Sequence, residues 1–277
     1  MRACVLFEDP HVTVARYDHP HGVPHRDPLR EESEAHAISF VERGAFSVHR
    51  GKSSWRLTRG ALFVTRPGLR YRCTHESEMP DDVCLSLRPS ADLVEQAASE
   101  AGRRWDDRVP AAPLTNRLAY LHGHLLAAME DSQRPAAVPP LVREILVEVL
   151  GGPTHRALCG GRQLAWYAER VDAARDLMER RFAEPLTIEA LGREVGMSTF
   201  HFCRIFRELT GVPPHRYLVG IRLERAAEAL RRGTRVTAAA HDAGFSNLGQ
   251  FIRQFHRAHG VTPSHYRRAR GISSTHS

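Results

Sequence analysis

Lysine is almost absent from this sequence, since Lys52 is the only one among 277 residues. A bias this uniform indicates genome composition and not the chemistry of a site. Cysteine is scarce too: five scattered residues with no CxxC pair argue against a disulfide framework and favour a reducing compartment. Nowhere do about 18 apolar residues run together, and acids and a proline interrupt the first ten residues, so we expect a cytoplasmic protein without membrane span or targeting segment.

The length and composition are those of an ordinary globular protein. A chain of 277 residues is about twice the usual size of one domain, so we expect two domains, or one domain with a long appendage. The content of 42% hydrophobic and 26% charged residues excludes wholesale disorder.

The net charge is unevenly distributed. Residues 1–171 hold 22 basic and 22 acidic side chains, whereas residues 172–277 hold 17 and 10, so the whole excess of +7 lies in the last part of the chain. A basic domain beside a neutral one favours a polyanion such as DNA as its partner, although chance drift explains the charge alone equally well.

Short alternating runs fill residues 1–90. Runs of four to six residues, bounded by glycine, proline and charge, predict an antiparallel β-sandwich or barrel. The predicted strands cover 36–41, 45–49, 54–57, 61–64 and 83–87. Residues 13–35 are polar and rich in histidine and proline, and we expect them to form an extended loop.

Helical spacing begins after residue 90. Apolar residues recur every three or four positions over 92–98, 114–130 and 141–150, with breaks at 134–140 and 151–153. We expect these amphipathic stripes to pack within the chain, with a dimer interface as the alternative.

An internal repeat marks the last part of the chain. The segment 196–214 returns as 244–263, at an offset of 48 that becomes 49 where the second copy has one extra residue. The identical pairs are Gly196/Gly244, Ser198/Ser246, Phe202/Phe251, Arg204/Arg253, Phe206/Phe255, Gly211/Gly260, Val212/Val261, Pro214/Pro263 and Tyr217/Tyr266. Identities in this fixed order indicate a duplicated structural unit.

Each copy has the pattern of a helix-turn-helix. The expected caps and turns are Thr187, Gly196 and Ser198 in the first copy, and Gly244 and Ser246 in the second. The second copy begins with a helix over 236–243, and a connecting helix over 215–232 joins the copies. In such a unit the second helix presents its polar side to the major groove of DNA.

Residues 172–270 resemble the DNA-binding domain of the AraC/XylS family of bacterial transcription regulators. The matching motifs are Pro185-Leu186-Thr187-Ile188, Gly196-Met197-Ser198, Arg204-Ile205-Phe206, Thr210-Gly211, Arg222-Leu223-Glu224-Arg225-Ala226, Ala243-Gly244-Phe245-Ser246, Phe251-Ile252-Arg253-Gln254-Phe255 and Gly260-Val261-Thr262-Pro263. The resemblance implies seven helices, an asymmetric promoter site and, usually, activation through RNA polymerase. Residues 271–277 are expected to form a disordered tail.

The resemblance also implies which residues read bases. The matching positions are Phe200, Cys203 and Arg204 in the first unit, and Leu248, Gly249 and Arg253 in the second. An arginine that contacts guanine twice supplies about 1–3 kcal/mol of discrimination, whereas phenylalanine and leucine at best touch thymine methyls and glycine reads nothing. We expect Asn247 and Gln250 to contact phosphate, so that most base specificity lies in the first unit. Packing is the competing role for Cys203, and the alternative for both arginines is a solvated side chain or an ion pair within the domain.

The N-terminal part is similar to the cupin-like sensor domain that precedes such DNA-binding domains. The segment 60–71 carries the family's glycine, strand and Pro-Gly turn. Tyr71, however, stands where a metal-binding cupin has histidine, and His19 and His21 lie in a proline-rich stretch without the following glutamate. Since a catalytic metal needs three such ligands, we expect no metal, no cofactor and no catalytic site.

Two weaker signals lie in the same region. Cys73 and His75 precede an acidic turn over 76–82 and Cys84 follows it, so that Cys73 and Cys84 face one another if this segment is a hairpin. A redox switch or a soft-metal sensor is the functional interpretation, and two ordinary strand cysteines are the alternative. Four aromatic residues line a small-molecule pocket or fill the barrel: Phe46, Trp55, Phe63 and Tyr71.

These features predict an α+β multidomain protein. It has a cupin-like β-sandwich or barrel at 1–90, a helical connector and candidate dimerisation segment at 91–165, and an all-α domain with two helix-turn-helix units at 172–270. The predicted function is that of a transcription regulator, not an enzyme, with double-stranded promoter DNA, RNA polymerase, an unknown small-molecule effector and a second copy of the chain as partners. The alternatives are a metal-dependent cupin enzyme and an architectural DNA binder without an effector.

Overall fold

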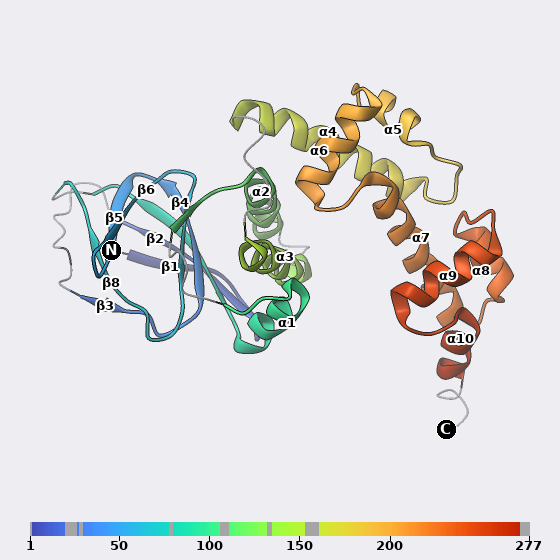
Figure 1. The fold of residues 1–277 in the computed structure, drawn as a ribbon, viewed down its shortest axis with the longest axis horizontal. Helices are drawn as coiled ribbons and strands as arrows, with labels where there is room; N and C mark the ends of the chain where they lie inside the picture. The colour runs from blue at the N-terminus through green and yellow to red at the C-terminus, as the bar shows by residue number, and fades with distance from the viewer. Residues whose placement is uncertain are drawn as a thin grey trace. The chain divides into compact units, whose positions relative to one another are not determined.

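The computed structural model describes residues 2–19, 27, 30–77, 80–105, 111–131, 135–152 and 161–271. The chain forms two compact units, Met1–Leu158 and Cys159–Ser277. Strands and helices make up the first unit, and the described residues of the second unit form helices and their connections (Figure 1). Apart from Gly271, the expected tail lies outside the described residues, as do Cys159 and His21.

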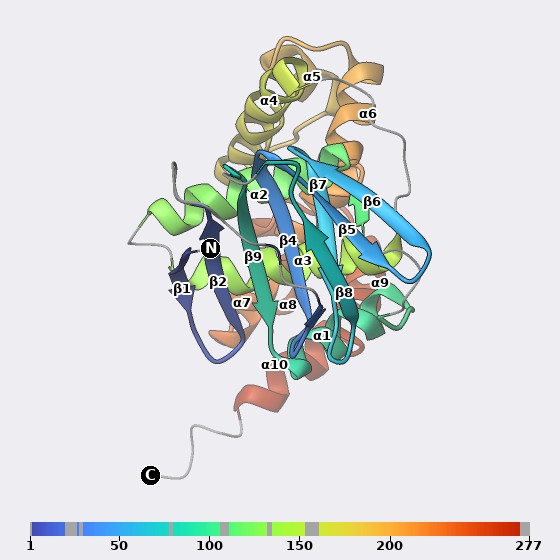
Figure 2. The same cartoon turned by 90° about the vertical axis from the view of Figure 1, so that its left-hand side faces the viewer.

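The first unit contains two antiparallel sheets. Its strands are β1 Arg2–Glu8, β2 Val12–Asp18, β3 Glu31–Glu32, β4 Ala37–Arg43, β5 Ala45–Arg50, β6 Ser53–Thr58, β7 Ala61–Thr65, β8 Arg70–Thr74, β9 Val83–Pro89 and β10 Ala111–Pro113. One sheet has the order β1-β2-β9-β4-β7-β10, and the other has the order β3-β8-β5-β6. The first five strands of the larger sheet lie side by side in Figure 2. The five predicted strands are β4, β5, β6, β7 and β9.

Three helices cover the larger sheet on the side away from the smaller sheet (Figure 1). They are α1 Ala91–Ala101, α2 Asn116–Glu130 and α3 Val138–Gly151, with a 3-10 turn η1 at Pro135–Ala137. Their apolar stripes share one core with strand residues such as Phe40 and Leu85. The segment expected to act as a connector therefore buries its apolar faces inside the first unit.

Inner strands of the larger sheet contribute to two cores, because successive side chains of a strand point to opposite sides of the sheet. On β4, Phe40 joins the core under the helices, while Val41 joins the core between the sheets. Leu62 and Phe63 of β7 divide in the same way. The second core, between the sheets, surrounds the cavity described below.

Two boundaries differ from the sequence-based expectations. The expected loop over 13–35 contains most of β2 and all of β3. The strand β2 forms because Val12 and Val14 alternate with a polar residue and are buried under the helices. The expected break over 134–140 is shorter, because α3 begins at Val138 with prolines in its first turn, where no intrahelical N–H bond is lost.

Seven helices occupy the described residues of the second unit. They are α4 Gly161–Arg180, α5 Ile188–Glu194, α6 Thr199–Thr210, α7 Pro214–Arg231, α8 Val236–Asp242, α9 Leu248–His259 and α10 Pro263–Gly271. The connecting helix α7 and the leading helix α8 have nearly the bounds that the sequence predicts. None of the helices over the described residues of the chain is both long enough and apolar enough to cross a membrane.

The helix caps of this unit follow the sequence only in part. Thr187 caps α5, because its hydroxyl accepts a hydrogen bond of 3.1 Å from the backbone N–H of Ala190. Ser198 occupies the N-cap position of α6 without a side-chain hydrogen bond to the helix. The expectation that Ser246 caps α9 is wrong: Asn247 does so, and its Oδ1 accepts a hydrogen bond of 2.8 Å from the N–H of Gln250.

Candidate nucleic-acid interface

The first helix-turn-helix consists of α5 and α6. Gly196 makes the turn between them with a φ of 70°, which favours glycine. One face of α6 is fully buried through Phe202, Ile205 and Phe206. Since these residues occupy the inner face at helical spacing, the residues between them face solvent.

The second helix-turn-helix consists of α8 and α9. Phe251 and Phe255 fix the inner face of α9, and neither side chain has measurable exposure. Gly244 makes the turn with a φ of 82°, and a Cβ atom there would lie 2.9 Å from the Cα of Ala183. This turn therefore packs directly on the segment between α4 and α5, which belongs to the first half of the unit.

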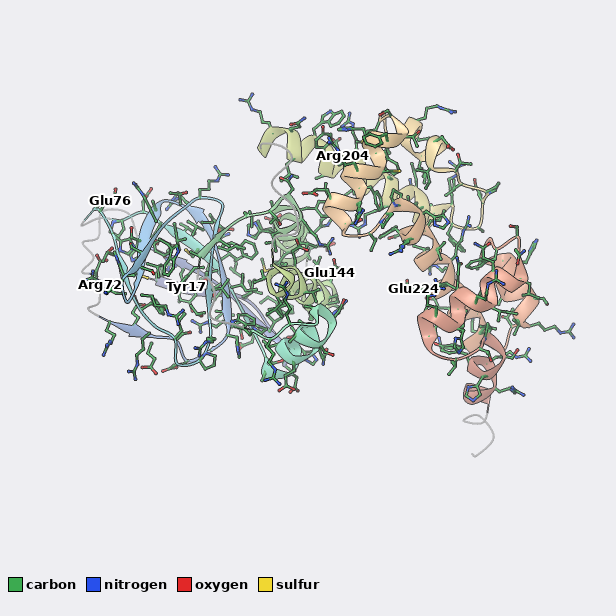
Figure 3. The ribbon with its side chains drawn as sticks, in the orientation of Figure 1. Tyr17, Arg72, Glu76, Glu144, Arg204 and Glu224 are labelled. Atoms are coloured by element: carbon green, nitrogen blue, oxygen red, sulfur yellow. The ribbon has the colours of Figure 1, made fainter. Side chains whose placement is uncertain are left out.

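The candidate DNA-binding residues lie on the outer faces of α6 and α9. All of them are exposed except Cys203, which is half-buried. Phe200 is 80% exposed and Leu248 is 41% exposed. Arg204 is labelled on α6 in Figure 3. The structure thus places the predicted residues of each helix-turn-helix together, on one solvent-facing helix or at its N-cap.

Neither Arg204 nor Arg253 has a hydrogen bond or an ion pair within the described part of the chain. The structure therefore does not contain the alternative of an arginine paired within the domain, whereas the alternative of a solvated arginine stays open. Arg253 lies across the first turn of α9, since a Cβ atom on Gly249 would come within 3.6 Å of its Nη1 atom.

Two further residues refine this surface. Burial raises the pKa of the Cys203 thiol, with a smaller contribution from the Glu189 carboxylate, which fits a packing role better than a reactive one. Ile252 is 37% exposed beside Arg253 and was not among the residues predicted from the sequence. Because Phe251 and Phe255 already fill the inner face of α9, the exposed Ile252 is a further candidate for contact with DNA.

The first unit contains a cavity between its two sheets. Its volume is about 430 Å³, within the usual range for small-molecule sites. Phe46, Phe63 and Tyr71 line it, whereas Trp55 packs in the same core without lining it. Three of the four aromatic residues selected from the sequence thus border this space.

The two cysteines of this region do not form a hairpin pair. Cys73 lies on β8 in the smaller sheet and Cys84 on β9 in the larger sheet, so the hairpin expectation is wrong. Both line the cavity as free thiols. Burial raises the pKa of Cys84 to about 12 and, together with Glu31, raises that of Cys73 further, so both stay protonated at neutral pH.

Sequence reasoning missed one group of residues at the cavity wall. His19, His75 and Asp82 bring their nitrogen and oxygen atoms within 4.8 Å of one another. They follow β2, follow β8 and precede β9, so no short motif joins them. Only the pairing of the strands brings these ends together.

Known proteins resemble this chain mainly in the second unit. A family model described as a helix-turn-helix domain matches residues 191–269. The bifunctional transcriptional activator and DNA repair enzyme Ada of Escherichia coli K12 is 35% identical over 83 residues, which are 30% of this chain and only 23% of Ada. A solved structure of a transcriptional regulator from Chromobacterium violaceum, described by its AraC-type DNA-binding domain, is 27% identical and has a TM-score of 0.36; the match covers 38% of this chain and 96% of that one.

One relative matches almost from end to end. The transcriptional activator RhaS of Shigella boydii serotype 18 is 31% identical over 257 residues, which are 90% of each chain. This match includes both units, so it extends well beyond the helix-turn-helix region. Together with the two helix-turn-helix units in the structure, it shows that the chain belongs to the AraC/XylS family of DNA-binding transcription regulators.

Proposed function

We propose that this protein is a sequence-specific activator that binds promoter DNA in the cytoplasm through α6 and α9 and responds to a small molecule bound in its first unit. The observation that carries the proposal is the pair of exposed helix faces with Arg204 and Arg253, whose guanidinium groups have no partner among the described residues. The family resemblance supports contact with RNA polymerase during activation. A homodimer formed through residues 91–165 stays a prediction.

Each recognition helix has a distinct role in this proposal. Arg204 and Arg253 donate two hydrogen bonds each to guanine, and the exposed Phe200 and Leu248 contact thymine methyl groups. The first helix-turn-helix supplies most of the base discrimination. Asn247 and Gln250, at the start of α9, position the second helix-turn-helix on phosphate.

The cavity supports the effector part of the proposal. A pocket of about 430 Å³ with aromatic walls and several polar side chains suits a small polar molecule. The sandwich of two antiparallel sheets around it supports a cupin-like fold for the first unit. Neither thiol in its wall is activated, which disfavours a redox switch built on Cys73 and Cys84.

The test is binding of the full-length protein to the DNA upstream of its own gene, compared with a scrambled duplex over a series of salt concentrations. We expect a preference of two decades or more and a steep loss of affinity with salt, because neutralised phosphates release counterions. Arg204→Ala should reduce the preference about 10-fold or more, in line with the loss of a bidentate guanine contact.

Arg231→Ala is the matched control, since Arg231 is an exposed arginine at the end of α7 and outside both recognition helices. It should keep the preference for the specific duplex. An equal loss on both duplexes in Arg204→Ala would assign that residue to phosphate. Equal affinity of the wild type for both duplexes favours an architectural binder, and no affinity at low salt contradicts the proposal.

A further inference from the structure

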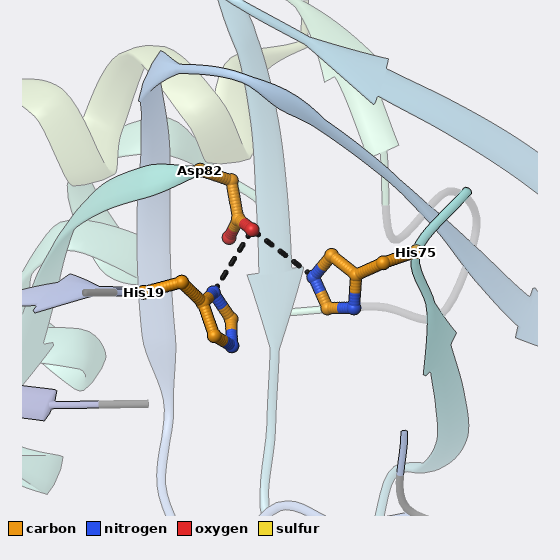
Figure 4. Close-up of side chains that lie close together, drawn as sticks. All are labelled: His19, His75 and Asp82. Atoms are coloured by element: carbon orange, nitrogen blue, oxygen red, sulfur yellow. Dashed lines mark ion pairs between the residues drawn. The ribbon is translucent and has the colours of Figure 1, made fainter. Parts of the chain in front are cut away.

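Three side chains from separate segments meet at the wall of the cavity in the first unit (Figure 4). The Nδ1 atom of His19 lies 2.9 Å from Oδ1 of Asp82, and the Nε2 atom of His75 lies 3.1 Å from the same oxygen. All three side chains are at least nine-tenths buried, with exposed fractions of 4%, 9% and 6% for His19, Asp82 and His75. Two imidazoles and a carboxylate thus converge in a nearly solvent-free place.

The spacing of these atoms suits a common metal ion. Two ligand atoms bound at about 2.0–2.1 Å to one tetrahedral ion lie roughly 3.3 Å apart. The two separations from Asp82 to the imidazoles, 2.9 and 3.1 Å, are close to this value, and all three ligand atoms lie within 4.8 Å of one another. Imidazole nitrogen and carboxylate oxygen are the donors that first-row transition metals such as Zn²⁺ share. A divalent ion also neutralises the carboxylate, which removes the penalty of burying its charge.

A fourth residue holds one of the imidazoles in the orientation that a ligand needs. The Nδ1 atom of His75 lies 2.5 Å from Oδ1 of Asp27, and the backbone N–H of His75 donates a hydrogen bond of 2.9 Å to Oδ2 of the same residue. A carboxylate that accepts from Nδ1–H leaves the lone pair of Nε2 for a metal and fixes the ring. Histidine ligands of metals usually donate their other ring N–H to a carboxylate in this way.

The backbone around Asp82 is fitted to the cluster as well. The N–H of His19 donates a hydrogen bond of 3.2 Å to the carbonyl oxygen of Asp82, which ties the two segments together. Gly44 packs against Asp82 so closely that a Cβ atom at position 44 would lie 2.6 Å from its Cα. Glycine at position 44, with a φ of 73°, therefore makes room for Asp82 at this point.

We propose that His19, His75 and Asp82 bind one divalent transition-metal ion of the Zn²⁺ type, with Asp27 as the residue that positions His75. Three protein ligands leave a fourth position open, and it faces the cavity because all three residues line it. This proposal goes beyond DNA binding and depends only on residues of the first unit. Among the described residues, the ligand atoms that lie within 4.8 Å of one another are those of His19, His75 and Asp82. The thiols of Cys73 and Cys84 do not belong to this group, so they are not ligands of this ion.

The test is titration of the full-length, chelator-treated protein with Zn²⁺ in competition with a colorimetric chelator. We expect one tightly bound equivalent. His75→Gln and Asp82→Asn should abolish this site. Asp27→Asn should weaken zinc binding 10- to 100-fold, as the loss of a carboxylate that orients a histidine ligand does. Two controls should bind Zn²⁺ as the wild type does: His11→Gln, which removes an exposed histidine of the same unit, and the double variant Cys73→Ser/Cys84→Ser.

Wild-type protein that takes up no tight equivalent of Zn²⁺ would overturn the proposal, and so would wild-type affinity in His75→Gln and Asp82→Asn. Circular dichroism shows whether these variants fold. If they do not, titration of the wild type with Co²⁺ decides: visible bands of a low-coordinate ion without a thiolate charge-transfer band support the site, and a thiolate band or no band contradicts it. DNA binding is measured separately, so its failure leaves this result unaffected.

Discussion

The Nε atom of Arg222 donates a hydrogen bond of 2.7 Å to the carbonyl oxygen of Phe182. The Nη2 atom of the same guanidinium donates a second one, of 2.8 Å, to the carbonyl oxygen of Glu184. Arg222 belongs to the connecting helix α7, and its two acceptors lie in the segment between α4 and α5. Because the turn at Gly244 packs on this same segment, Arg222 helps to fix both helix-turn-helix units to one support.

Arg222→Ala should therefore lower the free energy of unfolding of the second unit by about 1.5–3 kcal/mol, the range for hydrogen bonds that involve a charged group. Denaturant unfolding followed by circular dichroism measures this change. Arg231→Ala on the same helix is the control, because Arg231 is exposed and has no hydrogen bond or ion pair within the described part of the chain, so its loss should change the stability by less than about 0.5 kcal/mol. Equal effects of the two substitutions would contradict the role of Arg222.

Thr187 and Ser198, at the N-cap positions of α5 and α6, should contribute differently to stability when each is replaced by alanine. Thr187→Ala removes the hydrogen bond to the N–H of Ala190 and should destabilise the unit by about 1 kcal/mol. Ser198→Ala removes no cap hydrogen bond and should stay within about 0.5 kcal/mol of the wild type. Thermal unfolding of both variants provides the comparison, and a larger effect at Ser198 would show that its hydroxyl caps α6 after all.

Asn247 offers a way to separate helix capping from DNA binding. Asn247→Asp should leave the stability nearly unchanged, since aspartate caps helices as well as asparagine does, and should weaken DNA binding by placing a negative charge at the expected phosphate contact. Asn247→Ala should destabilise the unit by about 1 kcal/mol. Unfolding and DNA-binding measurements on both variants test this. Unchanged DNA affinity in Asn247→Asp at low salt would exclude a nearby phosphate.

The thiols should differ widely in reactivity. Cys4 is exposed and should react with iodoacetamide first, whereas Cys84 is buried with a pKa raised to about 12 and should react only on unfolding. Any slow labelling of Cys84 in the folded protein should keep accelerating as the pH rises past the ordinary pKa of a thiol, because the thiolate fraction of Cys84 grows up to its raised pKa. Mass spectrometry of labelled peptides measures this, with Cys4→Ser as the control. Rapid formation of a bond between Cys73 and Cys84 at neutral pH would restore the redox-switch interpretation.

The sequence predicted the second unit well because its signals are local. Helical spacing of Phe202 and Phe206, the cap at Thr187 and the glycine turns each depend on residues a few positions apart, and the repeat showed them twice. The strands with strong alternation, such as β4 and β7, were identified for the same reason. The strand β1 was not predicted from the sequence, because it is an exposed edge strand with little alternation in burial.

Which segments lie next to each other was decided by the tertiary structure. The sequence alone determined two helix-turn-helix units, their connecting helix and the face of each recognition helix that carries Arg204 or Arg253. It left Cys73 and Cys84 on one expected hairpin, yet the strands that carry them belong to different sheets. It gave no reason to group His19, His75 and Asp82, because sheet pairing joins residues by backbone register across the fold and not by spacing along the chain.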